Sequence, residues 1–377
     1  MFDYETLKLI WWVLVGVLLI GFALTDGFDL GAAILIPVVG KTDNERRAVI
    51  NTIAPHWDGN QVWLITAAGA LFAAWPVVYA ASFSGFYWAM LLVLFSLFVR
   101  PVGFDYRSKV ENQRWRSSWD WGLCIGGIIP SVIFGVAFGN LLQGVPFHMD
   151  DSMRIFYTGS FWGLLNPLGL LAGIVSLSML VMHGATWLTM RTSGAMQDRS
   201  VKAARYTALA YLVTFIGTGV YLWLGIKGYT VTSEINFNGA IDPLSKTVER
   251  TNAGWLANYS LYPITIAAPV IAIAGGLLAL VSGRKGGLAF LGSSLAITGT
   301  LCTAGFAMFP FLMPSSTDFS SSLLMWDAVS SHKTLGIMMI AAGIFVPIIL
   351  LYTLWSYYKM WGKITPEHIE ENQHSLY

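Results

Sequence analysis

The chain has 377 residues, of which 22 are Lys or Arg and 21 are Asp or Glu, so its formal net charge is +1. Hydrophobic residues make up 55% and charged residues only 11%, against a charged share of about 25% in soluble domains. This composition excludes a water-soluble globular protein, a disordered chain and a nucleic-acid-binding protein with a basic face, and it indicates an integral membrane protein.

Apolar runs along the chain predict its membrane-spanning helices, each of which needs about 20 mostly apolar residues. The predicted fold is all-α, a polytopic helical bundle in which two four-helix bundles and a peripheral helix form a single transmembrane domain over residues 1–377. The first run lacks a basic leader and is predicted to stay as a membrane anchor. Nine segments qualify: residues 8–36, 54–75, 77–99, 120–142, 160–187, 205–226, 258–281, 288–311 and 336–358.

The second of these segments is the weakest, because it opens with polar residues and Trp75-Pro76 interrupts the backbone after it. A re-entrant second segment, which leaves eight spans, remains an alternative. The distribution of Lys and Arg favours nine spans with the N-terminus outside, since it puts 16 of the 22 basic residues on the cytoplasmic side. This orientation predicts an external loop at about 228–257 and a cytoplasmic tail at about 359–377. The six basic residues left outside are Lys8, Arg154, Lys227, Lys246, Arg250 and Lys333.

Ionisable side chains within apolar segments are the candidate functional residues, because a charge at bilayer depth is costly and usually faces protein or water. Asp26 and Asp29 in TDGFDLG lie three residues apart and so share one helix face. Two carboxylates at this spacing repel each other when both are ionised, so one is expected to hold a proton or meet a cation. Alternatively, both acids mark a helix end and face water.

The run PHWDGNQVWL concentrates polar residues at the start of the second segment. A carboxylate, an amide and an indole on one helix face are able to carry protons or hold a polar headgroup. The alternative is an interfacial helix start with an acidic first turn and a tryptophan of the membrane belt. The candidate residues here are Trp57, Asp58, Asn60, Gln61 and Trp63.

The run LFVRPVGFDYRSK places Arg100 among apolar residues at the end of the third segment. A buried arginine needs an acidic partner, and Asp58 or Asp105 is the predicted one. Arg107 and Lys109, which follow, are interpreted as cations that reach the cytoplasmic interface.

The remaining polar residues are given structural interpretations. Asp327 to Ser331 is typical of helix capping, and His183 is interpreted as a partner of a helix dipole. Cys124 and Cys302 are predicted to be small buried hydrophobes. The histidines form no convincing pair of axial haem ligands, and no metal site and no catalytic residue is predicted.

These residues leave two classes of function open: a proton-coupled secondary transporter and a subunit of a membrane redox complex. A transporter is expected to place interrupted helices at corresponding positions of two halves, whereas the polar runs here crowd into the first third of the chain. The second class is therefore favoured.

Several long runs resemble subunit II of the cytochrome bd-type quinol oxidases from one end of the chain to the other. They are FDYETLKLIWWVLVGVLLIGFALTDGFDLG, APHWDGNQVWLITAAGALFAAWP, FSGFYWAMLLVLFSLFVRPVGFDYRSK, AFGNLLQGVPF, AGFAMFPFLMPSS and LLYTLWSYYKMWGKIT.

The resemblance implies an aerobic respiratory complex of the bacterial inner membrane that oxidises ubiquinol and reduces dioxygen to water, generating a proton gradient without pumping. The partner would be subunit I, which carries two haem b and one haem d, and a small single-span accessory subunit would complete the complex. This chain would bind no haem directly, although a bound ubiquinone is possible. Carried onto this sequence, the polar motifs of the family fall on Asp29, Asp58, Arg100 and Asp105 as a proton pathway or buried polar network, and on Trp57, Asn60, Gln61 and Trp63 as a passage for quinone, lipid or oxygen.

Overall fold

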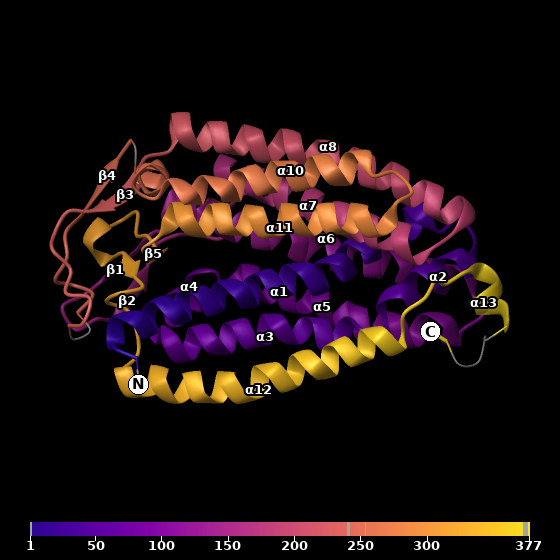
Figure 1. Ribbon diagram of the computed structural model, residues 1–377, viewed down its shortest axis with the longest axis horizontal. Helices are drawn as coiled ribbons and strands as arrows, with labels where there is room; N and C mark the ends of the chain where they lie inside the picture. The colour runs from indigo at the N-terminus through magenta and orange to yellow at the C-terminus, as the bar shows by residue number, and fades with distance from the viewer. Residues whose placement is uncertain (1, 240–241, 253, 372–375) are drawn as a thin grey trace.

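Long helices run side by side along one axis in the computed structural model, which describes residues 2–239, 242–252, 254–371 and 376–377. The N-terminus lies at one end of this bundle and the C-terminus at the other (Figure 1). This arrangement follows from the composition, since in the bilayer a helix satisfies its own backbone hydrogen bonds and leaves apolar side chains to pack or to face lipid.

The helices form two groups of four and one peripheral helix, as the sequence predicts. In the second group α7 contacts α8, α8 contacts α10, α10 contacts α11, and α11 returns to α7. In the first group α1 contacts α3 and α6, and α6 contacts α5, while α1 and α6 also pack against α7. The first group is α1 (Tyr4–Val39), α3 (Trp57–Ala74), α5 (Tyr87–Tyr106) and α6 (Gln113–Gln143), and the second is α7 (Pro167–Arg191), α8 (Gly194–Gly225), α10 (Ala267–Val281) and α11 (Gly286–Met308).

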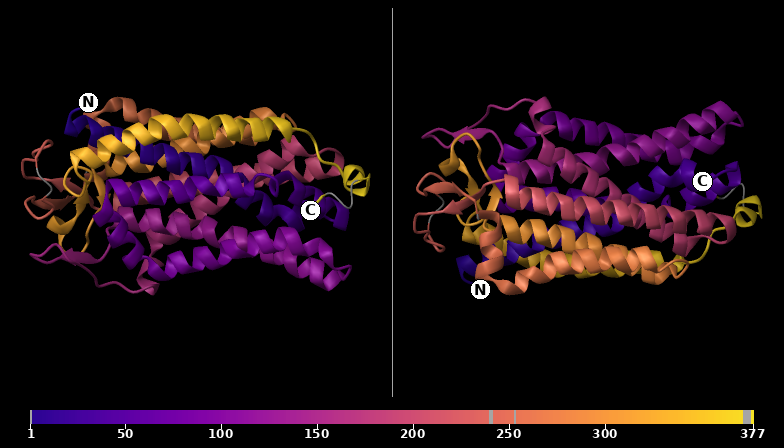
Figure 2. Two further views of the ribbon diagram at one scale, coloured as in Figure 1. Left: turned by 90° about the horizontal axis from the view of Figure 1, so that it is seen from below. Right: turned by 90° about the horizontal axis from the view of Figure 1, so that it is seen from above.

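The peripheral helix is α12 (His332–Lys359), which contacts α1 and α3 and is exposed over most of its length. Figure 2 shows it on the outside of the bundle when the molecule is seen from below. Its outer face is apolar and has no covering segment among the described residues.

Eight helices in the described part of the chain are long and apolar enough to cross a membrane. The polar first turn of α3 keeps it out of this set, yet its 18 residues extend about 27 Å and run beside α1 along the bundle (Figure 1). With α3 as the additional crossing, successive long helices alternate in direction and the termini fall at opposite ends. This agrees with the predicted nine segments.

The predicted third segment, residues 77–99, is two helices in the structure. The chain turns at Phe86 between α4 (Pro76–Gly85) and α5, and α5 continues through Pro101 to Tyr106, beyond the predicted end. The extension is possible because Arg100 meets acidic partners inside the bundle, so the helix carries this charge without leaving the protein interior.

Short elements close the two ends of the bundle. The end that holds the C-terminus carries α2 (Asp43–Ile53), α13 (Pro366–Glu371) and the loops rich in Lys and Arg (Figure 1); it is called the basic end below. The other end carries three antiparallel strand pairs and the short helix α9 (Ala257–Leu261). The predicted external loop also belongs to this end, and its residues 240–241 and 253 lie outside the described residues. The pairs are β1 (Phe147–Met149) with β2 (Ile155–Tyr157), β3 (Gly228–Val231) with β4 (Val248–Thr251), and β5 (Phe311–Met313) with β6 (Leu323–Leu324).

Candidate functional site

The centre of the candidate site is a buried turn of α1 that carries two acids. Asp26 and Asp29 are both completely buried, as expected for residues three apart on an inward helix face. This turn approaches α7 very closely, because a Cβ atom added at Gly31 would lie 2.0 Å from the carbonyl oxygen of Leu180. Only glycine permits this contact, which fixes the position of the acidic turn against the second helix group.

Arg100 of α5 forms an ion pair with these acids in the protein interior. Its guanidinium donates to Asp26 through Nη1 at 3.0 Å and Nη2 at 2.6 Å, and Nη2 lies 3.8 Å from Oδ2 of Asp29. All three side chains are completely buried. The site therefore holds one cation for two carboxylates, and the pair Asp26–Arg100 has the stronger, two-bond geometry.

Asn60 of α3 links Asp29 to the peripheral helix. Its Nδ2 donates to Oδ2 of Asp29 at 2.8 Å, and its Oδ1 accepts a hydrogen bond of 2.6 Å from the hydroxyl of Tyr357 on α12. Oδ1 of Asp29 and Nε of Arg100 have no hydrogen-bond partner within the described chain. We call the five residues Asp26, Asp29, Asn60, Arg100 and Tyr357 the buried polar network; it ties α1, α3, α5 and α12 together.

The network leads toward the basic end of the bundle through His56. The His56 ring stacks on Tyr357 with a centroid separation of 4.3 Å and an angle of 6° between the rings. Burial, together with the nearby charge of Arg191, lowers the pKa of His56 to about 4. His56 is therefore neutral at physiological pH.

The predicted residues Trp57, Gln61 and Trp63 lie around this network. The Arg100 guanidinium is 5.8 Å from the centroid of the Trp57 ring, which is cation–π range. Trp63 is half-buried and packs on α1, where its ring would touch a Cβ atom added at Gly21. Gln61 is half-buried and makes no hydrogen bond within the described residues.

Asp58 and Asp105 do not join the network, so the predicted pairing of Arg100 with either of them is wrong. Both are exposed, and neither has an ion-pair partner in the part of the chain that the structure describes. Helix geometry explains this: at 100° per residue, Asp58 lies about 200° around α3 from Asn60, and Asp105 lies about 140° around α5 from Arg100. These acids face away from the interior.

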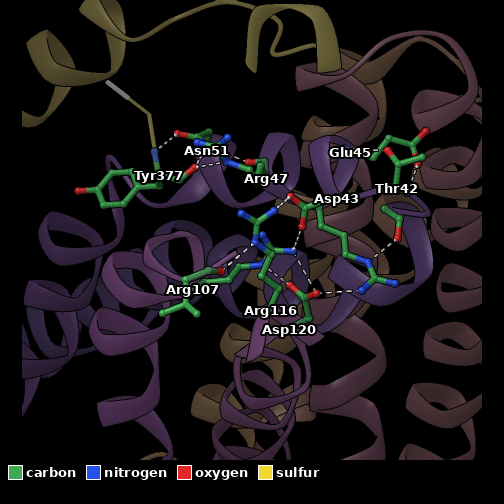
Figure 3. Close-up of polar contacts among 12 residues, drawn as sticks. Thr42, Asp43, Glu45, Arg47, Asn51, Arg107, Arg116, Asp120 and Tyr377 are labelled. Atoms are coloured by element: carbon green, nitrogen blue, oxygen red, sulfur yellow. Dashed lines mark hydrogen bonds and ion pairs between the residues drawn. The ribbon is translucent and has the colours of Figure 1, made fainter. Parts of the chain in front are cut away.

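A second ion network closes the basic end of the first helix group (Figure 3). Arg107 is buried, contrary to its predicted interfacial position, and its Nε bonds Oδ1 of Asp120 at 2.5 Å while Nη2 bonds Oδ1 of Asp43 at 2.9 Å. Arg116 also binds Asp43, at 2.7 Å, and Arg46 binds Asp120 at 2.9 Å. The predicted arginine stays inside the protein because Asp120 of α6 supplies a buried counter-charge.

The last residue of the chain docks on the same end (Figure 3). Asn51 of α2 donates to the carbonyl oxygen of Tyr377 at 2.9 Å and accepts from its backbone N–H at 3.1 Å, and Arg47 donates to the same carbonyl at 3.1 Å. The chain end is thereby held against α2.

His183 is buried and forms hydrogen bonds to two other helices, so its predicted role as a partner of a helix dipole is wrong. Its Nε2 donates to the carbonyl oxygen of Leu24 at 2.9 Å, so Nδ1 accepts from the hydroxyl of Ser293 at 2.8 Å. Both ring nitrogens are used in holding α7 to α1 and α11. The described residues also contain no cluster of three or more His, Cys, Asp or Glu side chains that could hold a metal ion.

At the opposite end, Asp327 has a partner beyond its predicted capping role. Its Oδ1 accepts from the backbone N–H of Leu324, and its Oδ2 lies 2.8 Å from Nζ of Lys246. Burial raises the pKa of Asp327, an effect that Lys246 opposes. Helix capping itself belongs to Ser331, whose hydroxyl accepts from the N–H of Thr334 at the start of α12.

An apolar cavity of about 530 Å³ lies between α1, α6 and the second helix group. Phe22, Phe134, Phe215 and Trp223 are among the side chains that line it. The hydroxyl oxygen of Thr218, also in the lining, is buried and has no hydrogen-bond partner among the residues that the structure describes. The cavity therefore combines apolar walls with an unused hydroxyl group.

The model of one protein family matches almost the whole chain. Residues 7–360 match the family described as cytochrome bd terminal oxidase subunit II. Among curated proteins, the chain is 57% identical to cytochrome bd-I ubiquinol oxidase subunit 2 of Escherichia coli K12, with all of both chains covered.

More distant relatives have related descriptions. The probable cytochrome oxidase subunit 2 of Haemophilus influenzae is 53% identical with all of both chains covered. The cytochrome bd ubiquinol oxidase subunit 2 of Bacillus subtilis is 33% identical, over 93% of this chain and 94% of that protein. A chain in the structure of bd oxidase from Geobacillus thermodenitrificans matches with a TM-score of 0.64 at 11% identity, covering 95% of this chain and 98% of that one, which demonstrates a shared fold.

Proposed function

Because the chain belongs to the cytochrome bd terminal oxidase subunit II family, we propose that it works beside a haem-bearing subunit I and stabilises it in the membrane. The chain is a subunit of a bd-type quinol oxidase, an oxidoreductase complex of the bacterial inner membrane. The full-length 57% identity to a curated subunit of such an enzyme is the observation that carries this conclusion. No comparison supports the alternative of an independent proton-coupled transporter.

In the proposed complex the haems b and d are held by subunit I, and when bound they transfer the electrons of ubiquinol to dioxygen. His183 is completely buried and uses both ring nitrogens in hydrogen bonds to α1 and α11, which supports a haem site elsewhere. A small single-span subunit is proposed as a further partner. The exposed apolar face of α12 leaves room for such neighbours.

We assign the buried polar network the task of holding and passing a proton within this subunit. Arg100 compensates Asp26 through two hydrogen bonds, so Asp29 is the carboxylate left to bind a proton. Asn60 and Tyr357 connect Asp29 to the region of His56 at the basic end. The same bonds fix four helices, so a purely structural network is the alternative function.

Asp58 and Asp105 are proposed to act at the surface that this chain presents to its partner. Both carboxylates are exposed and unpaired within the described chain. An exposed acid on a membrane helix needs water or a polar group of another subunit. We propose that they supply the outer part of the proton path, where subunit I provides the next groups.

The apolar cavity fits the long isoprenoid chain of a ubiquinone, and we propose it as the site of a bound quinone in this subunit. Its volume of about 530 Å³ suits part of such a chain. The unpartnered hydroxyl of Thr218 is available to a quinone carbonyl oxygen. Trp57, Gln61 and Trp63 are not among its lining residues and remain candidates for a lipid or oxygen passage.

The first prediction tests the exposed acid Asp58 in the complete complex. Asp58→Asn removes a proton-binding group but keeps the size and polarity of the side chain, so quinol-dependent oxygen consumption is expected to fall at least about tenfold. The reduced-minus-oxidised haem spectrum should remain, because no fold contact is lost.

Asp198→Asn serves as the control, since Asp198 is half-exposed and pairs with Arg284 at the basic end. Full turnover of the Asp58→Asn complex would leave Asp58 without a proton-conducting role. A purified chain that carries no haem partner and takes up a substrate in liposomes would instead return the transporter function to first place.

A further inference from the structure

Arg191, the last residue of α7, is a buried cation without an acidic partner. Its side chain is only 3% exposed, and within the described residues no carboxylate forms an ion pair with it. Four acids of the basic end pair with other cations: Asp43 and Asp120 in the network of Figure 3, Glu45 with Arg199, and Asp198 with Arg284. A buried charge of this kind needs a counter-charge, which the described residues do not supply.

Aromatic rings hold the guanidinium from two sides. Its central carbon lies 5.1 Å from the centroid of the Trp187 ring and 5.3 Å from that of Trp361. The segment Met360–Ile364 wraps over it, because the Met360 carbonyl accepts from Nη2 at 2.9 Å and the Ile364 N–H donates to the Arg191 carbonyl at 2.9 Å. Gly362, with φ of +152°, provides the backbone conformation that this segment needs.

Three donor nitrogens in this place have no acceptor among the described residues. They are Nε and Nη1 of Arg191 and Nε1 of Trp187, a side chain that is itself 2% exposed. Trp187 and Arg191 are four residues apart and lie on the same face of α7. A positive charge with several unused donors matches an anionic oxygen ligand, and phosphate is the one that arginine binds best in this way.

The position of the site in the membrane indicates where the phosphate comes from. Arg191 ends α7, and the segment over it directly follows the end of α12, so the site lies at the level of the headgroups on the basic side. The exposed ring of Trp361 lies against the guanidinium, and Trp355 and Tyr358 are exposed on the last turns of α12, as is typical of the interface. Lys359 at the end of α12 and Lys363 in the segment after it are exposed and attract anionic lipids.

We propose that Arg191, Trp187 and the segment Met360–Ile364 bind the phosphate of an anionic phospholipid from the leaflet at the basic end. The lipid headgroup enters beside Trp361, takes the free donors of Arg191 and Trp187, and supplies the missing counter-charge. The bound lipid then fastens the end of α12 to α7, so anionic lipid stabilises the subunit.

The test uses the purified complete complex, stripped of lipid in detergent and then supplied with phosphatidylglycerol, phosphatidylcholine or inorganic phosphate. The readout is the midpoint temperature for loss of the intact complex, together with the phospholipids retained in native mass spectrometry. Arg191→Gln is compared with Arg284→Gln, which removes the same charge from an exposed ion pair at the same end.

Phosphatidylglycerol is expected to raise the midpoint by several degrees in the unmodified complex and in Arg284→Gln, but by less than half as much in Arg191→Gln, which should also retain fewer copies of this lipid. Phosphatidylcholine should have little effect on any of them. If phosphatidylglycerol raised the midpoint of Arg191→Gln as much as that of the unmodified complex, the proposal would be overturned. If inorganic phosphate raised the midpoint as much as phosphatidylglycerol does, the assignment to a lipid would be overturned.

If Arg191→Gln does not yield an intact complex, Trp361→Leu decides the matter. Trp361 is 58% exposed, so its replacement leaves the fold in place but removes one of the two rings that hold the guanidinium. Retention of phosphatidylglycerol should fall in this variant. Unchanged retention and protection would contradict the site.

Discussion

At the scale of single residues, the most consequential feature is that every deeply buried arginine of the first helix group has acidic partners. Arg100 meets Asp26 and Asp29, and Arg107 meets Asp120 and Asp43. Removing one member of such a pair leaves an uncompensated charge in a medium where it is poorly solvated. Stability should therefore depend on these pairs far more than on the exposed ones.

Arg100→Gln is expected to destabilise the complex by about 3–5 kcal/mol, because it leaves two carboxylates together without a cation. The measurement is the midpoint temperature for loss of the intact complex. The double variant Arg100→Gln with Asp26→Asn should recover part of the loss, since it removes one stranded charge. Arg284→Gln, which breaks an exposed pair, should change stability by less than about 0.5 kcal/mol, and a loss as large as that of Arg100→Gln would contradict this account.

His56 gives the fold a dependence on acid pH. Its pKa falls from 6.5 to about 4 in the folded chain, so the unfolded state binds a proton over this interval and the folded state does not. The free energy of unfolding is therefore not reduced by His56 above about pH 6.5. As the pH falls toward 4, this residue lowers the free energy of unfolding by at most about 3 kcal/mol.

His56→Phe keeps a flat ring against Tyr357 but cannot be protonated. The difference in midpoint temperature, His56→Phe complex minus unmodified complex, should increase as the pH is lowered from 6.5 to 4. Above pH 7 the difference should be constant. Parallel pH curves for the two complexes would show that His56 does not titrate as its burial requires.

At the scale of helices, small residues decide how closely α1 and α7 approach. Gly31 and Gly184 face each other, and a Cβ atom at Gly184 would lie 2.3 Å from the backbone nitrogen of Ala32. In the membrane, where lipid is as apolar as leucine, such close backbone contact is a main source of helix association. It also fixes the rotation of α1 that turns both acids toward Arg100.

Gly31→Ala is expected to destabilise the subunit by about 1–3 kcal/mol or more, because the added methyl group meets the rigid carbonyl of Leu180. Gly16→Ala on the same helix is the matched control, since nothing lies within 4 Å of the added atom. The control should be neutral or stabilising by up to about 1 kcal/mol, as alanine favours helix. Equal midpoint temperatures for the two complexes would mean that α1 moves away from α7 at little cost.

At the scale of the whole molecule, the alternation of long helices separates two chemically different ends. One end collects α2, α13, the ion network of Figure 3 and most of the basic loops, and the other collects the strand pairs. The excess of Lys and Arg predicts that the first end faces the cytoplasm. The buried polar network lies nearer this end, so a proton it takes up would come from the cytoplasmic side.

This orientation predicts which positions react with a membrane-impermeant thiol reagent in intact cells. After replacement of Cys124 and Cys302 by alanine, Ser152→Cys should be labelled from outside, and Lys285→Cys only after the membrane is opened. Both side chains are exposed on the protein surface, so a difference in labelling reports the side of the membrane and not burial. Labelling of Lys285→Cys in intact cells would reverse the topology.

The sequence by itself determined the features that depend on local composition and periodicity. Apolar runs of sufficient length predicted the long helices, the spacing of Asp26 and Asp29 predicted a shared face, and motifs distributed over the chain predicted the family. Each of these signals is contained within a few helical turns or is a direct match of residues. No knowledge of helix packing is needed to identify them.

The tertiary structure alone decided which groups meet. Arg100 pairs with an acid 74 positions away, and Asn60 with a tyrosine 297 positions away, because the rotation of each helix about its axis brings them together. The sequence contains the charges but not these rotations, so Asp58 and Asp105 were wrong as partners and Arg107 was wrong as an interfacial cation. The unsatisfied donors of Arg191 and Trp187 are likewise identified only from the tertiary structure. Whether a donor has an acceptor depends on which residues surround it in space.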